Sequence, residues 1–525
     1  MNKAERLNKF MIEIVDVVRD GAQDPRFRSS VERKTEMVLA SEEFGIELIE
    51  GGWPGANAID TEFFRQMRGV LRDSQLIAFG MTIKGTRADK DAGLRSLLES
   101  GTDIITLVGK TWRQNVERTL RIPWQENLDN IFESIKFLRG QRREVFFDAE
   151  HWFDGRKQNK EHAFEVLEAA IAGGANRLVL CDTRGASSDR FIYEAVTDAV
   201  ARFPDAKFGI HAHGDGGLAE INTIRALEAG VVQVQGTVNG IGERTGNMNL
   251  CTFLPTLQFI YGIETGLDLT RLTPFARAVA DICGIPIHPD APYVGENAFA
   301  HKAGLHASGQ KRDESSYQFI RPEDVGNKQI YIFSEQSGST NLEIMLEKHG
   351  YALSRKNPKF RSLLEKMETS LLIGDTQQFL FLYEHLEGKQ RPFSVLEGTG
   401  VEDFSPLPPK ARVKVRINGD QYFEEAVGVG PINAIDIALK KVLLTNCPEV
   451  SDIELLDYSS VGLLEGNPNT ASEVEVCVKV RFNGEEVTSV VRGTNQNRVG
   501  VDALEDAYNY CIIKHRRRTR EKVLS

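Results

Sequence analysis

The first half of the chain alternates short apolar runs with longer amphipathic stretches. The pattern repeats about every 30 residues, the spacing of strand–helix units in a parallel sheet. Eight runs are predicted to be strands: residues 12–18, 45–52, 75–82, 103–109, 144–152, 177–183, 207–213 and 231–240. Eight parallel strands close a (β/α)8 barrel, so the predicted fold class is α/β, a TIM barrel. A doubly wound open sheet is the alternative.

Polar side chains gather at the carboxyl end of nearly every predicted strand. They are Arg19 and Asp20, Glu50, Glu150 and His151, Asp182 and Thr183, His211 and His213, and Asn239 with Glu243 and Arg244. Active sites of TIM barrels lie at this end of the strands. The distribution favours the barrel over the open sheet and predicts an active site on its rim.

The strand–helix alternation stops near residue 265. Residues 285–309 are rich in turn formers and carry histidines, and helical patterns follow at 338–350 and 379–388. The proline-rich segment 405–411 then marks a boundary. We predict three parts: a catalytic barrel (1–265), helical linker subdomains that complete the active site (266–400) and a regulatory or dimerisation domain (405–525).

The last domain contains an internal repeat. Val-Arg-Ile-Asn-Gly at 415–419 recurs as Val-Arg-Phe-Asn-Gly at 480–484, and Asn-Gly between β-rich flanks signals a hairpin. A helical pattern follows each copy, at 432–444 and 500–513. This predicts an α+β regulatory domain that dimerises or senses a ligand rather than one that catalyses.

Composition and charge narrow the class of protein. Of 525 residues, 41% are hydrophobic and 26% charged, and no apolar run approaches the length of a membrane helix. The net charge of −11 argues against nucleic-acid binding. The one basic run, residues 514–522, is interpreted as a solvated tail that ends a helix, with an RNA or membrane contact as the alternative.

Cysteine spacing and the amino terminus indicate the compartment. The six cysteines show no Cys-x-x-Cys spacing, which is typical of reduced, buried thiols. The chain is charged from its third residue and lacks a secretory apolar segment. We therefore predict a cytoplasmic protein.

Two histidines one residue apart are the strongest chemical signal. His211 and His213 end a predicted strand and point to the same face, as two ligands of one metal do. Asp20 is the natural carboxylate partner, and Asn247 is a candidate fourth ligand through its amide oxygen. Hydrogen-bonded structural histidines and an ordinary Arg19–Asp20 surface pair are the alternatives.

An ordered set of motifs resembles a known family, the acyl-CoA-condensing branch of the DRE-TIM metallolyases. The chain is most similar to the (R)-citramalate synthases, with 2-isopropylmalate synthases and homocitrate synthases as siblings. The resemblance spans nearly the whole chain. It rests on RDGAQ (19–23), IEGGWPG (49–55), FDAEHWFDG (147–155), LCDT (180–183), HAHGDGGLA (211–219), GTVNGIGERTGNMNL (236–250) and AFAHKAGLHASG (298–309).

The resemblance implies a role for each residue of the site. Asp20, His211, His213 and Asn247 would hold a divalent cation, Mg, Mn or Zn. Arg19 would stabilise the charge that develops on the keto oxygen of a 2-oxo acid. Glu150 would lie beside that substrate, and Thr183 would hydrogen-bond its carboxylate.

Proton removal from acetyl-CoA would fall to the segment after the barrel. The resemblance associates this step with His306 and Tyr317, whereas from sequence alone both could equally be structural. Because they lie outside the barrel, the linker of a partner subunit is a candidate source, and a homodimer is expected. A branched-chain amino acid, isoleucine or leucine, is the expected effector of the last domain.

Three positions depart from the family pattern. The leading Asp and the threonines of the first-strand motif are missing, because residues 15–18 read Val-Asp-Val-Val. Gly214 stands where Asn is usual. Arg184 adds a cation that either favours a more acidic 2-oxo acid or faces solvent.

The leading functional hypothesis is condensation of acetyl-CoA with a short 2-oxo acid, pyruvate first, followed by thioester hydrolysis. It would belong to isoleucine and branched-chain amino acid biosynthesis. One alternative is the same reaction on another 2-oxo acid, as in the 2-isopropylmalate and homocitrate synthases. A lyase that cleaves carbon–carbon bonds and a non-catalytic effector-binding paralogue are the others.

Overall fold

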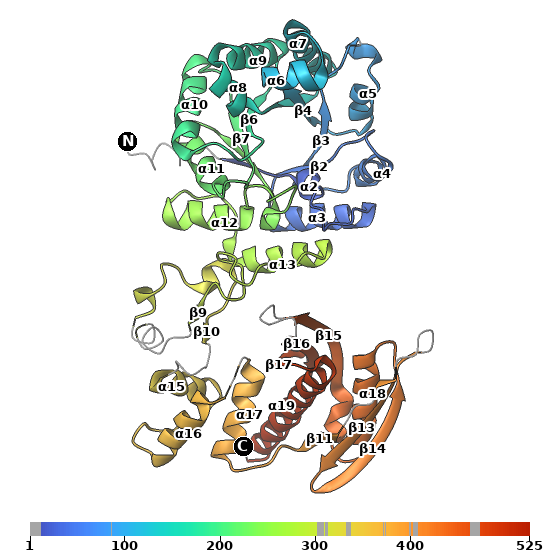
Figure 1. Ribbon diagram of the computed structural model, residues 1–525, viewed down its shortest axis with the longest axis vertical. Helices are drawn as coiled ribbons and strands as arrows, with labels where there is room; N and C mark the ends of the chain where they lie inside the picture. The colour runs from blue at the N-terminus through green and yellow to red at the C-terminus, as the bar shows by residue number, and fades with distance from the viewer. Residues whose placement is uncertain are drawn as a thin grey trace. The chain divides into compact units, whose positions relative to one another are not determined.

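The computed structural model describes residues 12–85, 87–301, 309, 313–331, 338–370, 372, 374–397, 401–402, 408–462 and 473–524. The chain forms two compact units (Figure 1). The first contains residues 1–299 and 319–329, and the second contains residues 300–318 and 330–525. Each unit has a separate hydrophobic core.

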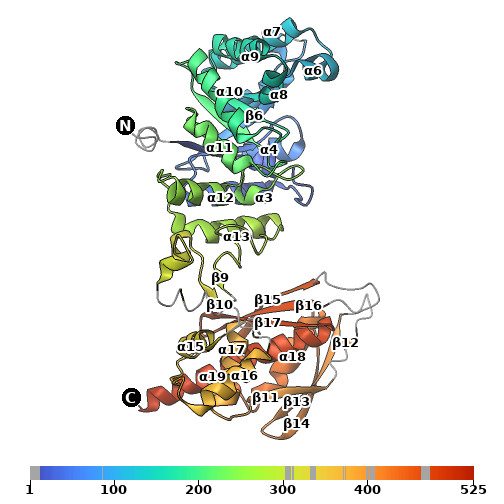
Figure 2. The ribbon, with the colours of Figure 1, turned by 60° about the vertical axis from the view of Figure 1, so that its left-hand side comes forward.

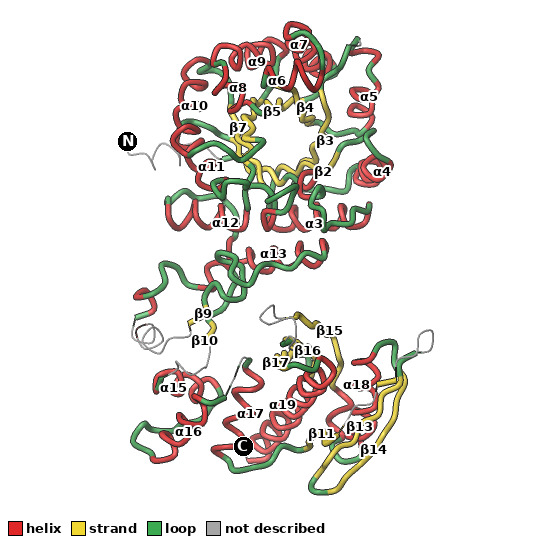
Figure 3. Tube along the Cα trace, viewed as in Figure 1, coloured by secondary structure: helices red, strands yellow, loops and turns green. Residues whose placement is uncertain are grey.

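The first unit is a closed barrel of eight parallel strands in chain order, as predicted. Strand β1 pairs with both β2 and β8, which closes the ring (Figure 3). The strands are β1 (Glu13–Asp16), β2 (Leu48–Gly52), β3 (Gln75–Met81), β4 (Ile104–Lys110), β5 (Glu144–Glu150), β6 (Arg177–Asp182), β7 (Phe208–Ala212) and β8 (Gln233–Gly236).

Helices surround this ring (Figure 3). Asn57 begins α4 as an N-cap that accepts a hydrogen bond from the backbone N–H of Asp60 at 2.8 Å. The helices of the first unit are α2 (Val18–Gly21), α3 (Val31–Phe44), α4 (Ala58–Met67), α5 (Ala92–Glu99), α6 (Arg113–Asn115), α7 (Trp124–Gly140), α8 (Trp152–Gln158), α9 (Lys160–Gly173), α10 (Asp189–Arg202), α11 (Ala219–Glu228), α12 (Leu250–Pro255) and α13 (Leu272–Cys283).

The strands present two different faces. Alternate residues point outward into the core that they share with the helices, as Ile49, Leu107 and Ile210 do. Six inward residues form an apolar cluster inside the barrel, the apolar plug: Val15, Val17, Leu48, Ile77, Ile104 and Phe146. Two residues further along the same faces, Leu48 is followed by Glu50 and Phe146 by Asp148. The barrel interior therefore changes from apolar to polar toward the carboxyl ends of the strands.

The first strand is shorter than predicted. It ends at Asp16, and residues 18–21 form the helical turn α2. Arg19 and Asp20 therefore lie on a turn directly above the barrel, not on the strand itself. The Asp16 carboxylate accepts a hydrogen bond from the Ser41 hydroxyl at 2.6 Å, and burial raises the pKa of Asp16 to about 7. Asp16 supports α3 and takes no part in the polar interior.

The second unit contains helices and two larger sheets. Strand β13 pairs with β11, β12 and β14 in one sheet, and β15, β16 and β17 form the other. Its elements are β9 (Ala300–His301), β10 (Ile330–Tyr331), α15 (Ser339–Lys348), α16 (Pro358–Glu368), α17 (Asp375–Leu386), β11 (Phe393–Glu397), β12 (Val401–Glu402), β13 (Lys410–Ile417), β14 (Asp420–Val427), α18 (Pro431–Leu444), β15 (Ile453–Gly462), β16 (Val474–Phe482), β17 (Glu485–Gly493) and α19 (Gln496–Leu524).

The sequence repeat in this unit is a repeat of structure. Both Asn-Gly pairs adopt positive φ, 51° and 98° at Asn418 and Gly419 and 51° and 80° at Asn483 and Gly484. Two consecutive left-handed residues make the type I′ hairpin turn that the motif predicts. Helix α18 packs on β13 and β14, and α19 on β16 and β17 (Figure 2).

The basic run at 514–522 ends helix α19, as predicted, and Arg516, Arg518 and Arg520 are exposed. Three of its arginines also pair with acids of the same unit. Arg516 contacts Glu449 at 2.7 Å, Arg517 pairs with Glu387, and Arg518 contacts Glu485 at 2.9 Å. Since these charges are used within the unit, they help to hold the long helix α19 in place.

Two further features agree with the sequence. All six cysteines are free thiols, and five of them are buried. Among the helices in the described part of the chain, none is long and apolar enough to cross a membrane.

A buried acid makes the stability of the second unit depend on pH. The Glu505 carboxylate, on α19, accepts a hydrogen bond from the Val395 backbone N–H at 2.9 Å. Burial raises the pKa of Glu505 to about 7, against the counteracting field of Arg391. Because the folded state holds this proton more tightly than the unfolded state, stability is highest below about pH 4.5 and falls as the pH rises through 7.

We expect Glu505→Gln to remove this loss, because the amide oxygen still accepts from Val395 and cannot ionise. The variant should exceed the parent by about 2–3 kcal/mol in free energy of unfolding at pH 8 and match it at pH 4. Urea unfolding followed by far-ultraviolet circular dichroism measures both. Glu424→Gln, at an exposed position of β14, is the control. An equal gain at both pH values would contradict the assignment.

Candidate metal and substrate site

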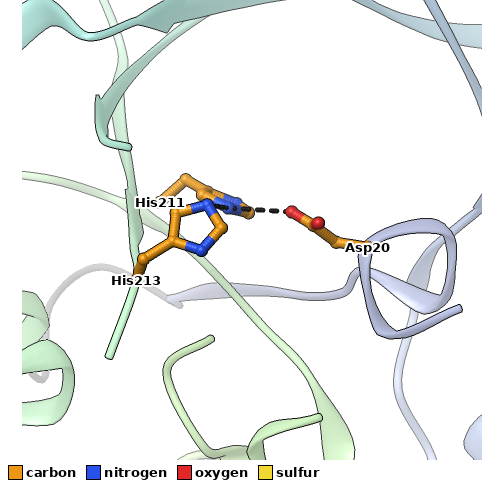
Figure 4. Close-up of side chains that lie close together, drawn as sticks. All are labelled: Asp20, His211 and His213. Atoms are coloured by element: carbon orange, nitrogen blue, oxygen red, sulfur yellow. Dashed lines mark hydrogen bonds and ion pairs between the residues drawn. The ribbon is translucent and has the colours of Figure 1, made fainter. Parts of the chain in front are cut away.

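Three of the predicted ligands converge at the top of the barrel. Asp20 on α2, His211 on β7 and His213 just after β7 each offer a ligand atom, and these atoms lie within 4.8 Å of one another (Figure 4). The His211 Nε2 atom lies 3.1 Å from Asp20 Oδ2 and 3.3 Å from His213 Nε2. All three side chains are buried. Two imidazoles and a carboxylate in this arrangement are a donor set for a divalent cation.

The protonation of these groups suits metal binding. Burial and then the neighbouring His211 lower the pKa of His213 to about 3, so this imidazole is neutral near pH 7. Burial alone would raise the pKa of Asp20, but Arg19 and the two histidines outweigh it and hold the pKa well below its usual range. The site therefore presents an anionic carboxylate and a neutral imidazole, the forms that bind metals.

Asn247, the candidate fourth ligand, lies next to His213. A backbone bridge joins it to His213, and its amide nitrogen donates to the Ile241 carbonyl at 3.1 Å. Its buried amide oxygen has no hydrogen-bond partner among the described residues. Gly242 makes room for this amide, because its φ is 151° and a Cβ atom there would lie 2.3 Å from the Asn247 nitrogen. An unsatisfied buried oxygen beside three ligands fits a metal.

Arg19 is the cation of the site. Its Nε atom donates to Glu50 Oε1 at 2.8 Å, and its Nη2 atom lies 3.5 Å from Asp20. The guanidinium carbon lies 3.9 Å from the centre of the Phe79 ring, and Trp53 packs edge-on against that ring at 5.5 Å. Acids on two sides and an aromatic face hold the guanidinium in one orientation.

Thr183 and Glu150 lie at the ends of neighbouring strands. The Thr183 hydroxyl accepts a hydrogen bond from the His151 backbone N–H at 2.8 Å, which leaves its own proton to donate. His151 presents this N–H from a left-handed conformation, φ 61°. Glu150 forms an ion pair with Lys110 at the end of β4.

Arg184 is exposed to solvent, and its charge is already paired. Its guanidinium donates to both oxygens of Asp154, at 2.6 and 3.1 Å, and lies 5.1 Å from the Trp112 ring. The buried Asp154 also lies 3.3 Å from His151. Asp154 therefore neutralises the extra cation.

Of the remaining predicted positions, the structure describes Tyr317 and Gly214 but not His306. Tyr317 belongs to the second unit, where it is 43% exposed and its ring lies 6.5 Å from that of His301. His306 lies outside the described residues. At Gly214, a Cβ atom would meet its nearest neighbour at 3.4 Å, an ordinary contact, so space does not demand glycine there.

The sequence analysis did not single out Asp148 or Gln235, and it named Glu50 only among the polar strand ends. All three are buried, and Glu50 is completely inaccessible. Burial and then the nearby Glu50 raise the pKa of Asp148. A signal was present for Glu50 and Asp148, because each interrupts an apolar strand at a position of the inward face. Without the closed ring, however, the inward face could not be identified.

Comparison with known proteins agrees with this geometry. Residues 11–279 match the HMGL-like family model, residues 293–369 match the homocitrate synthase post-HMGL domain-like model, and residues 373–512 match the LeuA allosteric (dimerisation) domain model. The first match contains the entire barrel and all its candidate metal ligands.

The chain belongs to the HMGL-like family. Relatives match along its full length. The (R)-citramalate synthase of Aquifex aeolicus is 36% identical over 516 residues, 95% of this chain and 97% of that protein. The (R)-citramalate synthases of Synechocystis and Geobacter sulfurreducens are also 36% identical, covering 94% and 96% of this chain and 94% and 98% of those proteins. This HMGL-like protein therefore falls in the branch of 2-isopropylmalate and homocitrate synthases that includes citramalate synthases.

The Arg19–Glu50 pair yields a stability prediction. Arg19→Met would leave the inaccessible Glu50 carboxylate without its partner, which costs about 3–5 kcal/mol in free energy of unfolding. Adding Glu50→Gln removes the stranded charge and should restore most of that loss. All four tryptophans lie in the barrel, so urea unfolding followed by tryptophan fluorescence measures this unit. A double variant no more stable than Arg19→Met would contradict the pairing.

Proposed function

We propose that this protein condenses acetyl-CoA with pyruvate and hydrolyses the resulting thioester to release citramalate and CoA. A new bond joins the acetyl methyl carbon to the keto carbon of pyruvate, and water then cleaves the carbon–sulfur bond of the thioester. The observation that carries the proposal is the convergence of Asp20, His211 and His213 with Arg19 at the top of the barrel. Full-length similarity to (R)-citramalate synthases supports it.

Asp20, His211, His213 and Asn247 would hold a divalent cation, with Mg, Mn and Zn as candidates. The cation would act as a Lewis acid on the oxygens of the 2-oxo acid. The neutral imidazole of His213, the anionic Asp20 and the unpartnered oxygen of Asn247 support this assignment.

Three other side chains of the barrel would handle the substrate. Arg19, fixed between Glu50 and Phe79, would donate to the keto oxygen as negative charge develops there. Thr183 would donate its hydroxyl proton to the substrate carboxylate, because its lone pair already accepts from His151. Glu150 would lie beside the reacting carbon with its charge balanced by Lys110.

The α-proton of acetyl-CoA would leave to a base from the segment after the barrel. His306 and Tyr317 are the proposed residues. Residues 266–400, between the barrel at 1–265 and the regulatory domain at 405–525, would thus be linker subdomains that complete the active site.

The last domain would serve in dimerisation and control. The LeuA allosteric (dimerisation) model matches residues 373–512, which supports an oligomer, and we propose a homodimer. A branched-chain amino acid, isoleucine or leucine, is the proposed effector. This assignment places the reaction in branched-chain amino acid biosynthesis.

The environment of Arg184 favours a small monocarboxylic substrate. A second carboxylate on the 2-oxo acid would need a cation, and Arg184 is already paired with Asp154 through two hydrogen bonds. The interior below the metal ligands carries the acids Glu50 and Asp148. Both features favour pyruvate over a dicarboxylic 2-oxo acid.

A panel of 2-oxo acids tests the reaction directly. CoA release from acetyl-CoA, followed with a thiol reagent, should require pyruvate, stop when a chelator removes the metal, and return when a divalent metal is added. His211→Ala should lower kcat/KM by at least 1000-fold, because one of two neutral nitrogen ligands is lost. His288→Ala, outside the ligand cluster, is the control.

Each contrary outcome has a distinct meaning. Unchanged turnover in His211→Ala would overturn the assignment of the site. Faster release with 2-oxoglutarate or 2-oxoisovalerate than with pyruvate would replace the substrate. Cleavage of a hydroxyacyl thioester without any condensation would indicate a lyase, and metal binding without turnover of any 2-oxo acid would indicate a non-catalytic paralogue.

A further inference from the structure

A chain of buried polar side chains leads from His211 across the barrel interior. The His211 Nδ1 atom lies 2.9 Å from Gln235 Oε1, and Gln235 Nε2 lies 3.5 Å from Asp148 Oδ1. The exposed fractions of His211, Gln235 and Asp148 are 4%, 1% and 3%. A neutral amide is thus placed between a candidate metal ligand and a carboxyl group on the far side of the ring.

The register of the strands produces this contact. His211 on β7 and Gln235 on β8 are direct partners in the parallel ladder, and both point into the barrel. Their side chains therefore lie at the same level. Asp148 reaches the amide from β5, where it occupies the inward position between Phe146 and Glu150.

Asp148 decides which way the amide faces. The Gln235 amide nitrogen donates to Asp148 Oδ1 at 3.5 Å, so the amide oxygen turns toward His211. That oxygen requires a proton on His211 Nδ1. The other ring nitrogen, Nε2, lies 3.1 Å from Asp20 Oδ2 and 3.3 Å from His213 Nε2, and it is the atom that would bind the metal.

We propose that Gln235, held by Asp148, is a positioning residue that fixes the tautomer and ring orientation of His211 for metal binding. The inference rests on the proposed function, since His211 must be a metal ligand. A hydrogen-bond acceptor behind a ligating imidazole orients the ring and increases its basicity. Here the acceptor is the Gln235 amide oxygen, and the hydrogen bond from the amide nitrogen to Asp148 fixes the orientation of the amide.

The same strand supplies a matched control. Gln233 precedes Gln235 by two residues on the same inward face and is equally buried. Its amide nitrogen donates to Glu13 at 3.1 Å, at the opposite end of the barrel from the ligands. Replacing either glutamine by leucine removes one buried amide from β8, but only Gln235→Leu removes the acceptor behind His211.

The experiment measures Mn²⁺ and Co²⁺ binding to the full chain, without substrate. We expect Gln235→Leu to weaken both affinities by 10- to 100-fold and to change the visible absorption of bound Co²⁺. Gln233→Leu should leave the affinities within twofold of the parent. Mn²⁺ and Co²⁺ affinities of Gln235→Leu within twofold of the parent would overturn the inference.

A double variant distinguishes positioning from a loss of packing. Gln235→Glu alone places two carboxyl groups together and should weaken metal binding. Adding Asp148→Asn restores one donor and one acceptor with their positions exchanged, so the new Glu accepts from both the new amide and His211 Nδ1. We expect Mn²⁺ affinity to return to within threefold of the parent. A double variant that folds but binds Mn²⁺ as weakly as Gln235→Glu would contradict positioning.

His211→Ala separates the two proposals. If it retains Mn²⁺ affinity, the metal site itself is wrong. If it loses Mn²⁺ affinity while Gln235→Leu does not, the metal site stands and only the role of Gln235 is wrong.

Discussion

The polar half of the barrel interior depends on one buried cation, the guanidinium of Arg19. It lies between Glu50 and Asp20 and against the Phe79 ring, in a region with almost no access to water. Charges in such a place persist only when neighbouring groups balance them. Arg19 thus helps to hold the pKa of Asp20 well below its usual range. Its loss would leave the inaccessible Glu50 carboxyl group without this charged partner.

The apolar and the polar side chains of the barrel interior lie at different depths. The apolar plug formed by inward residues such as Leu48 and Phe146 packs the lower interior, and the polar residues stand on it. Because Glu50 and Asp148 each follow an apolar residue by two positions on the same rigid strand, their depth is set by the ladder rather than by a flexible loop. The candidate ligand His211 lies on β7 and His213 directly after it, whereas Asp20 approaches from a helical turn.

The second unit is stabilised by its own hydrophobic core and by ion pairs of α19. Its two hairpin–helix repeats bury one common core, and Arg516 and Arg518 of α19, although exposed, pair with acids of the same unit. The paired cations explain why a basic terminus occurs in a chain of net charge −11 without implying a nucleic-acid partner. Buried Glu505 differs from these acids, since burial raises the pKa of its carboxyl group despite the Val395 N–H and the field of Arg391.

The sequence by itself determined the eight strands, the Asn-Gly hairpins and the histidine pair, because these depend on alternation and turn chemistry within a few residues. It did not reveal that Arg19 lies on a helical turn, that Asp154 pairs with Arg184, or that Gln235 lies 2.9 Å from His211. These facts depend on which residues of distant strands face one another inside the closed ring. Only the tertiary structure decides them, because register and closure join residues that local patterns treat as independent.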